Sequence, residues 1–150
     1  MAKIIAFDLT KRPPRSPRAR LGGYAILPRI LDKGRAVIAG TNGEYNYACP
    51  LDLLFLRYVG VDAEKLKARL AAGDGDGEIL AWIRKNATNA RADEEIATWT
   101  AYMDRRAPSS VELRAYFHDL HAKLAPARDD IVTWFDLLDL DDHASFGGPV

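Results

Sequence analysis

The sequence has 150 residues, with 21 basic and 21 acidic side chains, so its formal net charge at pH 7 is zero. A chain of this length most often forms one domain, and the neutral balance excludes a general attraction of the whole molecule to polyanions. No stretch approaches the roughly 20 consecutive apolar residues that a membrane helix needs. The single cysteine, Cys49, excludes an internal disulfide, and these features together predict a cytoplasmic protein that does not enter a membrane.

The charge is unevenly distributed along the chain. Residues 1–35 carry nine basic and two acidic side chains, so the remaining residues have the opposite excess, much of it in 129–142. Three prolines and five basic residues lie within 11–20, where proline disfavours helix, and we predict an extended basic arm over 1–23. The arm either lies on an acidic surface of its own chain or of a dimer mate, or binds phosphate groups or a nucleic-acid backbone. The compensating charge within the chain favours the first alternative.

Apolar spacing and helix-end residues predict an all-α or nearly all-α single domain of about six or seven helices. The helical core is expected over 24–142 and an irregular tail over 143–150, with the last helix near 129–139. At most a short strand or hairpin near 44–47 follows the turn signal Asn42-Gly43. The residues expected to mark helix ends are Pro28 and Gly40, Pro50 and Gly60, Asp62 and Gly73, Asp76, and Ser109 with Glu112.

A short pattern recurs four times at nearly even spacing. An acidic residue is followed by Ile or Leu, and three positions later comes an aromatic residue, at Trp82, Trp99, Tyr116 and Trp134. An acid is favoured in a first helical turn, and residues at i and i+3 share one helix face. The pattern therefore predicts four similar helices that bury these apolar residues, Leu113 included, against one another. We expect a bundle, because the residues typical of tetratricopeptide repeats are missing.

Residues able to hold a metal are few and poorly spaced. The loop 73–78 alternates glycine with acidic residues but lacks the full spacing of a calcium loop. His118 and His121 could share a helix face, yet both border the expected apolar stripe, which favours surface or boundary positions. The sequence also lacks a dinucleotide, phosphate-loop or paired-cysteine motif. We therefore predict neither a metal site nor a cofactor.

Two features could carry chemistry. Cys49 precedes a predicted helix start, where a thiol can become nucleophilic, but no nearby sequence identifies a histidine as its base. A buried, inert cysteine is the interpretation that we favour. Tyr24, Tyr45 and Tyr47 could form a stacking surface for single-stranded nucleic acid, which stays a hypothesis because no RNA-binding motif accompanies them.

Three segments together resemble one known family. PRSPRARLGGY (14–24), GEYNYACPLD (43–52) and DDIVTWFDLLDLDDHASFGG (129–148) are similar to segments of an uncharacterised family of short bacterial proteins with a domain-of-unknown-function label. The resemblance covers nearly the whole chain and implies a bacterial, cytoplasmic, single-domain protein, but it brings no catalytic residue. It also leads us to the hypothesis that the three segments form one ligand site, with Trp134 and the terminal acidic run. The residues of this candidate site are Arg18, Arg20, Gly22, Gly23, Tyr24, Glu44, Tyr45, Cys49 and Asp52.

Two functions are compatible with these residues. The first is a non-enzymatic binding or scaffold protein that meets an anionic partner, or its own dimer mate, through the basic arm. The second is a small enzyme with a pocket around Tyr24, Tyr45, Cys49 and a histidine. The expected partners are therefore a second copy of the chain or a small anionic molecule. Nucleic acid stays open as a third partner, and no membrane partner is predicted.

Overall fold

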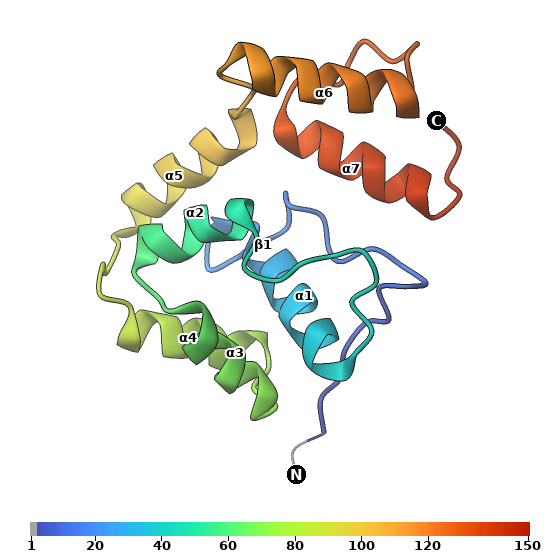
Figure 1. Ribbon diagram of the computed structural model, residues 1–150. Coiled ribbons are helices and arrows are strands. Elements are labelled where there is room, and N and C mark those ends of the chain that lie inside the picture. The colour runs from blue at the N-terminus through green and yellow to red at the C-terminus, as the bar shows by residue number, and fades with distance from the viewer. Residues whose placement is uncertain (1–2) are drawn as a thin grey trace.

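The computed structural model describes residues 3–150, and these residues are mostly helical, as the sequence predicted (Figure 1). They form seven helices and one two-stranded hairpin. The helices are α1 (Leu27–Ala39), α2 (Pro50–Val59), α3 (Ala63–Ala71), α4 (Asp76–Asn86), α5 (Asp93–Arg105), α6 (Val111–Leu124) and α7 (Trp134–Ser145). The strands are β1 (Arg20–Leu21) and β2 (Tyr24–Ala25). No helix within 3–150 has the length and apolar character that crossing a membrane would require.

The hairpin lies at the end of the arm and not near 44–47. β1 and β2 pair antiparallel, and the turn between them consists of Gly22 and Gly23, both at positive φ. A two-residue turn of that kind matches the twist of paired strands and favours glycine at both positions. Residues 44–47 form turns and irregular backbone instead. The Asn42 side-chain amide donates to the Tyr45 carbonyl oxygen (2.8 Å), which holds this segment in a turn.

Two hydrophobic clusters hold the elements together. The larger one joins the hairpin and α1–α5 around fully buried side chains such as Phe55, Leu66 and Ile79, and Phe135 of α7 inserts into it. The smaller cluster lies between α6 and α7 and contains Phe117. Figure 1 shows α6 and α7 side by side at one end of the molecule. We therefore describe the fold as an α1–α5 body, which carries the arm and the hairpin, and an α6–α7 unit.

The repeated pattern is buried as predicted in α4 and α5 but not in α6. Ile79 and Trp99 are buried in the larger cluster, and Trp82 packs against it while half-buried. Leu113 of α6 is 42% exposed, so the prediction that it is buried is wrong. The reason is that α6 packs chiefly on α7, which covers one narrow face of the helix, and Phe117 occupies that face.

The fourth copy of the pattern lies before its helix except for its last residue, Trp134. Asp130 and Ile131 precede α7, which begins at Trp134 and not near 129 as predicted. The Thr133 hydroxyl accepts the Asp136 N–H (3.1 Å), and the Asp136 carboxylate accepts the Thr133 N–H (2.9 Å). This reciprocal capping fixes the helix start more strongly than the acid–aliphatic pattern does. The far end also differs, since α7 continues three residues into the predicted irregular tail, to 145.

Two further helix starts differ from the prediction by one residue. Gly75, not Asp76, is the N-cap of α4, because the Glu78 carboxylate accepts the Gly75 N–H (3.2 Å). Ser110, not Ser109, caps α6, where its hydroxyl accepts the N–H at position 113 (3.1 Å). The predicted caps confirmed by the structure are Gly40, Gly60 and Asp62.

Candidate functional site

The basic arm lies against carboxylates of its own chain. Arg15 contacts both carboxylate oxygens of Asp32 on α1, each at 3.0 Å, and reaches Asp76 at the start of α4 (2.8 Å). Arg35 bonds the other oxygen of Asp76, also at 2.8 Å. Burial alone would raise the pKa of Asp76, but hydrogen bonds from Arg15 and Arg35 outweigh burial and hold that pKa below its usual value. Arg15 therefore ties α4 to α1.

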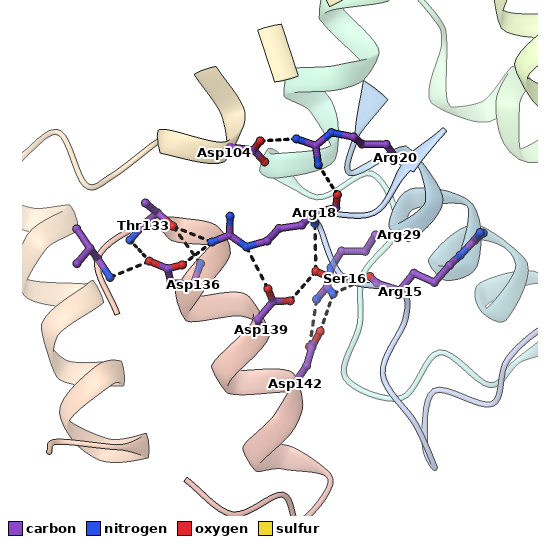
Figure 2. A network of polar contacts seen from close by, with 11 residues as sticks. Arg15, Ser16, Arg18, Arg20, Arg29, Asp104, Thr133, Asp136, Asp139 and Asp142 are labelled. Carbon is purple, nitrogen blue, oxygen red and sulfur yellow. Dashed lines mark hydrogen bonds and ion pairs between the residues drawn. The ribbon is translucent and has the colours of Figure 1, made fainter. Parts of the chain in front are cut away.

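The next arginines of the arm reach α7 and α5 (Figure 2). The Arg18 guanidinium contacts Asp136 and Asp139, which lie on successive turns of α7. Arg20 contacts Asp104 near the end of α5 at 2.5 Å. Each of these arginines is thus paired with an element far away in the sequence. Within one copy of the chain, the arm already has carboxylate partners.

A pocket of about 700 Å³ lies where the α6–α7 unit meets the α1–α5 body, and we name it the seam pocket. Its wall comes from residues far apart in the sequence, in the arm, α1, the 43–49 loop and the start of α2, as well as α6 and α7. Tyr116 and Leu138 line it from the α6–α7 unit, and Leu9 and Leu51 line it from the other side. Recesses between packed units are frequent ligand sites in proteins, so the seam pocket is the main candidate site.

Arg29, which lines the seam pocket, forms a buried ion pair with Asp142 of α7 (Figure 2). Its two terminal nitrogens lie 2.7 and 3.2 Å from the carboxylate oxygens, and the arginine side chain is only 4% exposed. The Tyr45 hydroxyl donates to the same carboxylate at 2.8 Å. Burial and this hydrogen bond to Asp142 raise the pKa of Tyr45 above its ordinary value, so the phenol keeps its proton and donates even in alkaline solution. Asp142 therefore holds α7 to both α1 and the 43–49 loop.

A second buried cation, Lys33, lies beside Cys49 at the seam pocket. Its Nζ is 2.8 Å from Asp52 Oδ1 and 3.5 Å from Cys49 Sγ. Asp52 is fully buried, and its Oδ2 atom has no hydrogen-bond partner within residues 3–150. Because the Asp52 carboxylate neutralises the ammonium charge of Lys33, the lysine offers the thiol little net positive field.

The charges at the seam pocket leave an acidic excess. The cations Arg29 and Lys33 are each paired with a carboxylate, whereas Glu44 and Asp141 line the pocket without an ion pair in the described part of the chain. Burial, followed by the neighbouring Asp142 carboxylate, raises the pKa of Asp141. A ligand with a positive charge or hydrogen-bond donors would relieve this excess, and a carboxylate or phosphate would increase it.

The structure brings together four of the residues that the sequence proposed as one site. Glu44, Tyr45 and Cys49 line the seam pocket, and Asp52 lies behind Cys49, where it is connected through Lys33. The half-exposed loop 43–49 and the start of α2 follow each other directly in the chain, so their closeness follows from the sequence.

The other five residues lie away from the seam pocket. Arg20, Gly22 and Gly23 line a different pocket of about 420 Å³ along α5. Arg18 forms ion pairs with two carboxylates of α7, Asp136 and Asp139. Tyr24 is 5% exposed and sits in the larger cluster with its ring edge-to-face against other aromatic rings.

Sequence reasoning did not single out Arg29 or Lys33 as site residues, and it included Asp141 and Asp142 only as members of the terminal acidic run. A helix with apolar periodicity ordinarily turns its charged positions toward solvent. In the structure these positions of α1 are covered, because α1 is central and both Arg29 and Lys33 are 4% exposed. Charged side chains on a helix that is buried on most sides would have indicated a polar site. The sequence does not show that α1 is buried in this way, because its burial depends on the packing of the other helices.

The histidines lie outside the seam pocket. His118 is exposed, and the rings of His121 and His143 contact the carbonyl oxygens of Arg128 and Pro149. None of the three lines the seam pocket. In the part of the chain that the structure describes, no group of three or more His, Cys, Asp or Glu side chains could hold a metal ion.

The fold and the seam pocket define a small, mostly helical protein with a ligand-sized recess, lined by apolar and polar side chains, between two packed units. A family model described as Domain of unknown function (DUF5069) matches residues 11–144, and the chain belongs to that family. This match confirms the resemblance to a domain-of-unknown-function family, since it runs from the arm through nearly all of α7. No curated protein matches the chain.

Proposed function

We propose that this protein binds a small organic molecule in the seam pocket and acts as a binding protein, not as an enzyme. The observation that carries the proposal is the pocket of about 700 Å³ between two packed units, with Glu44 and Asp141 in its lining and neither in an ion pair among the described residues. Ligand pockets commonly measure about 300–1,000 Å³ and combine apolar walls with a few polar groups. The ligand that fits this wall carries an amine, or several hydrogen-bond donors, on an apolar frame.

The aromatic residues of the wall suit the same ligand. Tyr45, Tyr116 and Phe146 all line the seam pocket. Tyr116 is 62% exposed, so much of its ring is available to a ligand. Aromatic faces attract organic cations, and neighbouring carboxylates strengthen that attraction. An aromatic or aliphatic amine is therefore the probe of choice.

The anionic partner predicted for the basic arm has weaker support. Arg15, Arg18 and Arg20 each contact a carboxylate of their own chain, so a polyanion would have to displace these contacts. A dimer mate docked on the arm would have to displace them as well. Both partners remain predictions, and the size of the protein in solution tests the second.

The enzyme alternative has one supporting observation, the contact between Lys33 and Cys49 at the seam pocket. Against it, Tyr24 lies in the core and the described histidines line other surfaces. The ammonium charge of Lys33 is also shared with Asp52. A catalytic Cys49 would therefore need a base other than the predicted histidine, and we keep this alternative as the second candidate.

Thermal melting with matched small molecules tests the proposed ligand class. A molecule that binds only the folded state raises the melting temperature. We expect aromatic amines to do so and aromatic carboxylates of the same size to have no effect. Asp141→Asn should reduce the shift, whereas Glu112→Gln, which changes an exposed carboxylate of α6 outside the pocket, should leave it unchanged. Stabilisation by carboxylates alone, or an equal shift in Asp141→Asn, would contradict the proposal.

A further inference from the structure

Two adjoining recesses lie along one side of α5, and neither shares a residue with the seam pocket. One has a volume of about 690 Å³ and is lined by Arg105 and Arg106, and we name it the basic groove. The other measures about 550 Å³ and is lined by Trp99, and we name it the aromatic recess. Thr98 and Tyr102 line both, so the two recesses form one continuous surface.

The basic groove has two cations and no carboxylate in its lining. Arg105 is exposed and Arg106 is half-buried, and neither forms an ion pair with any residue of 3–150, in contrast to Arg15, Arg18 and Arg20 of the arm. Ser109 also lines the groove, next to the N-cap residue Ser110 of α6. The first-turn N–H groups of that helix add partial positive charge. The groove therefore favours an anion, and a phosphate group best matches two guanidinium groups beside a hydroxyl.

The aromatic recess places flat rings next to these charges. Tyr58 stacks on Trp99, with ring centroids 5.1 Å apart and ring planes at 16°. Tyr102 lies between the two recesses and is 62% exposed, so its ring is available for stacking. Exposed aromatic rings beside basic side chains are a frequent way to hold a nucleobase together with its phosphate.

The acidic residues lie at the opposite end of this surface. Glu94 and Glu95 line the aromatic recess near the start of α5, whereas Arg105 and Arg106 lie at its end. Glu95 already accepts a hydrogen bond from Arg91 (3.3 Å), and Glu94 is left to accept from a ligand. This separation of charge along one helix would orient a ligand, with its phosphate toward the arginines and a donor such as an exocyclic amino group toward Glu94.

We propose that this side of α5 is a nucleotide site. The phosphate binds Arg105 and Arg106, and the base stacks against Tyr102 at the mouth of the aromatic recess. The nucleotide is either free in solution or one unit of a single-stranded nucleic acid, since both present a phosphate beside a base. This site is independent of the seam pocket, so the failure of one proposal leaves the other standing.

Calorimetric titration of the full chain with adenosine 5′-monophosphate, adenosine and inorganic phosphate tests the site. We expect the nucleotide to bind more tightly than either of its parts. The double variant Arg105→Gln/Arg106→Gln should weaken nucleotide binding at least about tenfold, because both charge-assisted contacts are lost. Tyr102→Ala should weaken nucleotide binding and leave phosphate binding unchanged. Lys85→Gln, which removes an exposed cation of α4 outside both recesses, is the matched control and should bind like the unaltered chain.

A single-stranded oligoadenylate then separates the two sources of the nucleotide. Affinity per site well above that of the mononucleotide, with a steep dependence on salt, assigns the site to nucleic acid. Equal affinity per site assigns it to a free nucleotide. The site is refuted if neither probe binds saturably at millimolar concentration. It is also refuted if the double variant and the unaltered chain bind the nucleotide equally, or if Tyr102→Ala has no effect on the nucleotide. The tested side chains of Tyr102 and Arg105 are exposed, so unchanged melting curves are expected for their variants.

Discussion

Arg29 and Asp142 are 113 positions apart in the sequence and form a buried, two-point ion pair between α1 and α7. The pair joins α1, which belongs to the larger hydrophobic cluster, to α7, which supplies residues to both clusters, and Tyr45 completes it with a third hydrogen bond to the carboxylate. Closer to the start of α7, the contacts of Arg18 add a second polar attachment. The position of the α6–α7 unit, and hence the shape of the seam pocket, therefore depends on polar contacts as well as on apolar burial.

Arg29→Met should destabilise the protein strongly. The substitution leaves Asp142 buried without its cation, and breaking a buried ion pair in this way costs about 3–5 kcal/mol. Arg29→Met combined with Asp142→Leu should recover part of the loss, because the uncompensated charge is removed as well. Urea unfolding at pH 7 measures the free energy of unfolding of both variants.

The partly exposed pair of Arg20 with Asp104 is the comparison for this experiment. The Arg20 side chain is 45% exposed, so Arg20→Met should cost less than about 1 kcal/mol. A double variant of the buried pair that is no more stable than Arg29→Met alone would show that the loss comes from packing and not from charge.

Trp99→Ala should also be strongly destabilising, whereas Leu113→Ala should be nearly neutral. Trp99 is 9% exposed and contacts three other aromatic rings, and truncating such a buried residue costs about 3–5 kcal/mol. Leu113 is 42% exposed, so its loss should stay below about 0.5–1 kcal/mol. Equal destabilisation of the two variants in urea would mean that α6 buries the face that the structure leaves exposed.

Asp76 should make the protein sensitive to acid. Its pKa in the folded state lies below the ordinary value of 3.8, so the stability it contributes is fully present above that value. The contribution is lost as the pH falls through the lower, folded-state pKa. Asp76→Asn should therefore flatten the dependence of the unfolding free energy on pH below about 4, as followed by urea unfolding at several pH values.

Asp141 should show the opposite sign. Its folded-state pKa is raised above 3.8, mainly by burial, so the ionised carboxylate opposes folding at neutral pH. Asp141→Asn should therefore raise the free energy of unfolding at pH 7, and this gain should vanish below the ordinary pKa of Asp. A variant less stable than the unaltered chain at pH 7 would indicate that Asp141 has a cation partner in solution.

Cys49 should react slowly with thiol reagents in the native protein, and Cys49→Ser should remain folded. The thiol is half-buried, and Asp52 neutralises the ammonium group beside it. Asp52→Asn should expose the thiol to the full charge of Lys33 and speed its labelling relative to the unaltered chain. Rapid labelling of the unaltered native protein would instead revive the enzyme alternative.

Removal of residues 1–20 should lower the melting temperature. The deletion takes away the ion pairs of Arg15, Arg18 and Arg20 with α1, α4, α5 and α7. High salt should reproduce part of the loss, because these pairs are partly exposed and are screened. Sizing of the full and the shortened protein, measured alongside, shows whether the arm also holds a dimer. An unchanged melting curve together with an unchanged mass would contradict both functions of the arm.

Local rules explain how much of the fold could be predicted. Gly40 and Gly60 end their helices at positive φ, a conformation that glycine adopts without strain, and Asp62 caps the next helix with its own side chain. The prolines of the arm exclude helix there regardless of what surrounds them. Each of these signals acts over a few residues, so the helical class, most helix ends and the extended arm follow from the sequence alone.

The tertiary structure decided what depends on partners far along the chain. The sequence showed that the arm needs opposite charge, but not that Arg15 would meet Asp76 or that Arg18 would meet Asp136. Nothing in the sequence marked Arg29 as buried, whereas the packing of α1 between other elements leaves it only 4% exposed. Apolar periodicity indicates which face of a helix is hydrophobic. Only the packing of distant segments determines whether the polar face is buried as well. The pairing of distant charges and the recesses between packed units were therefore decided by the folded chain as a whole.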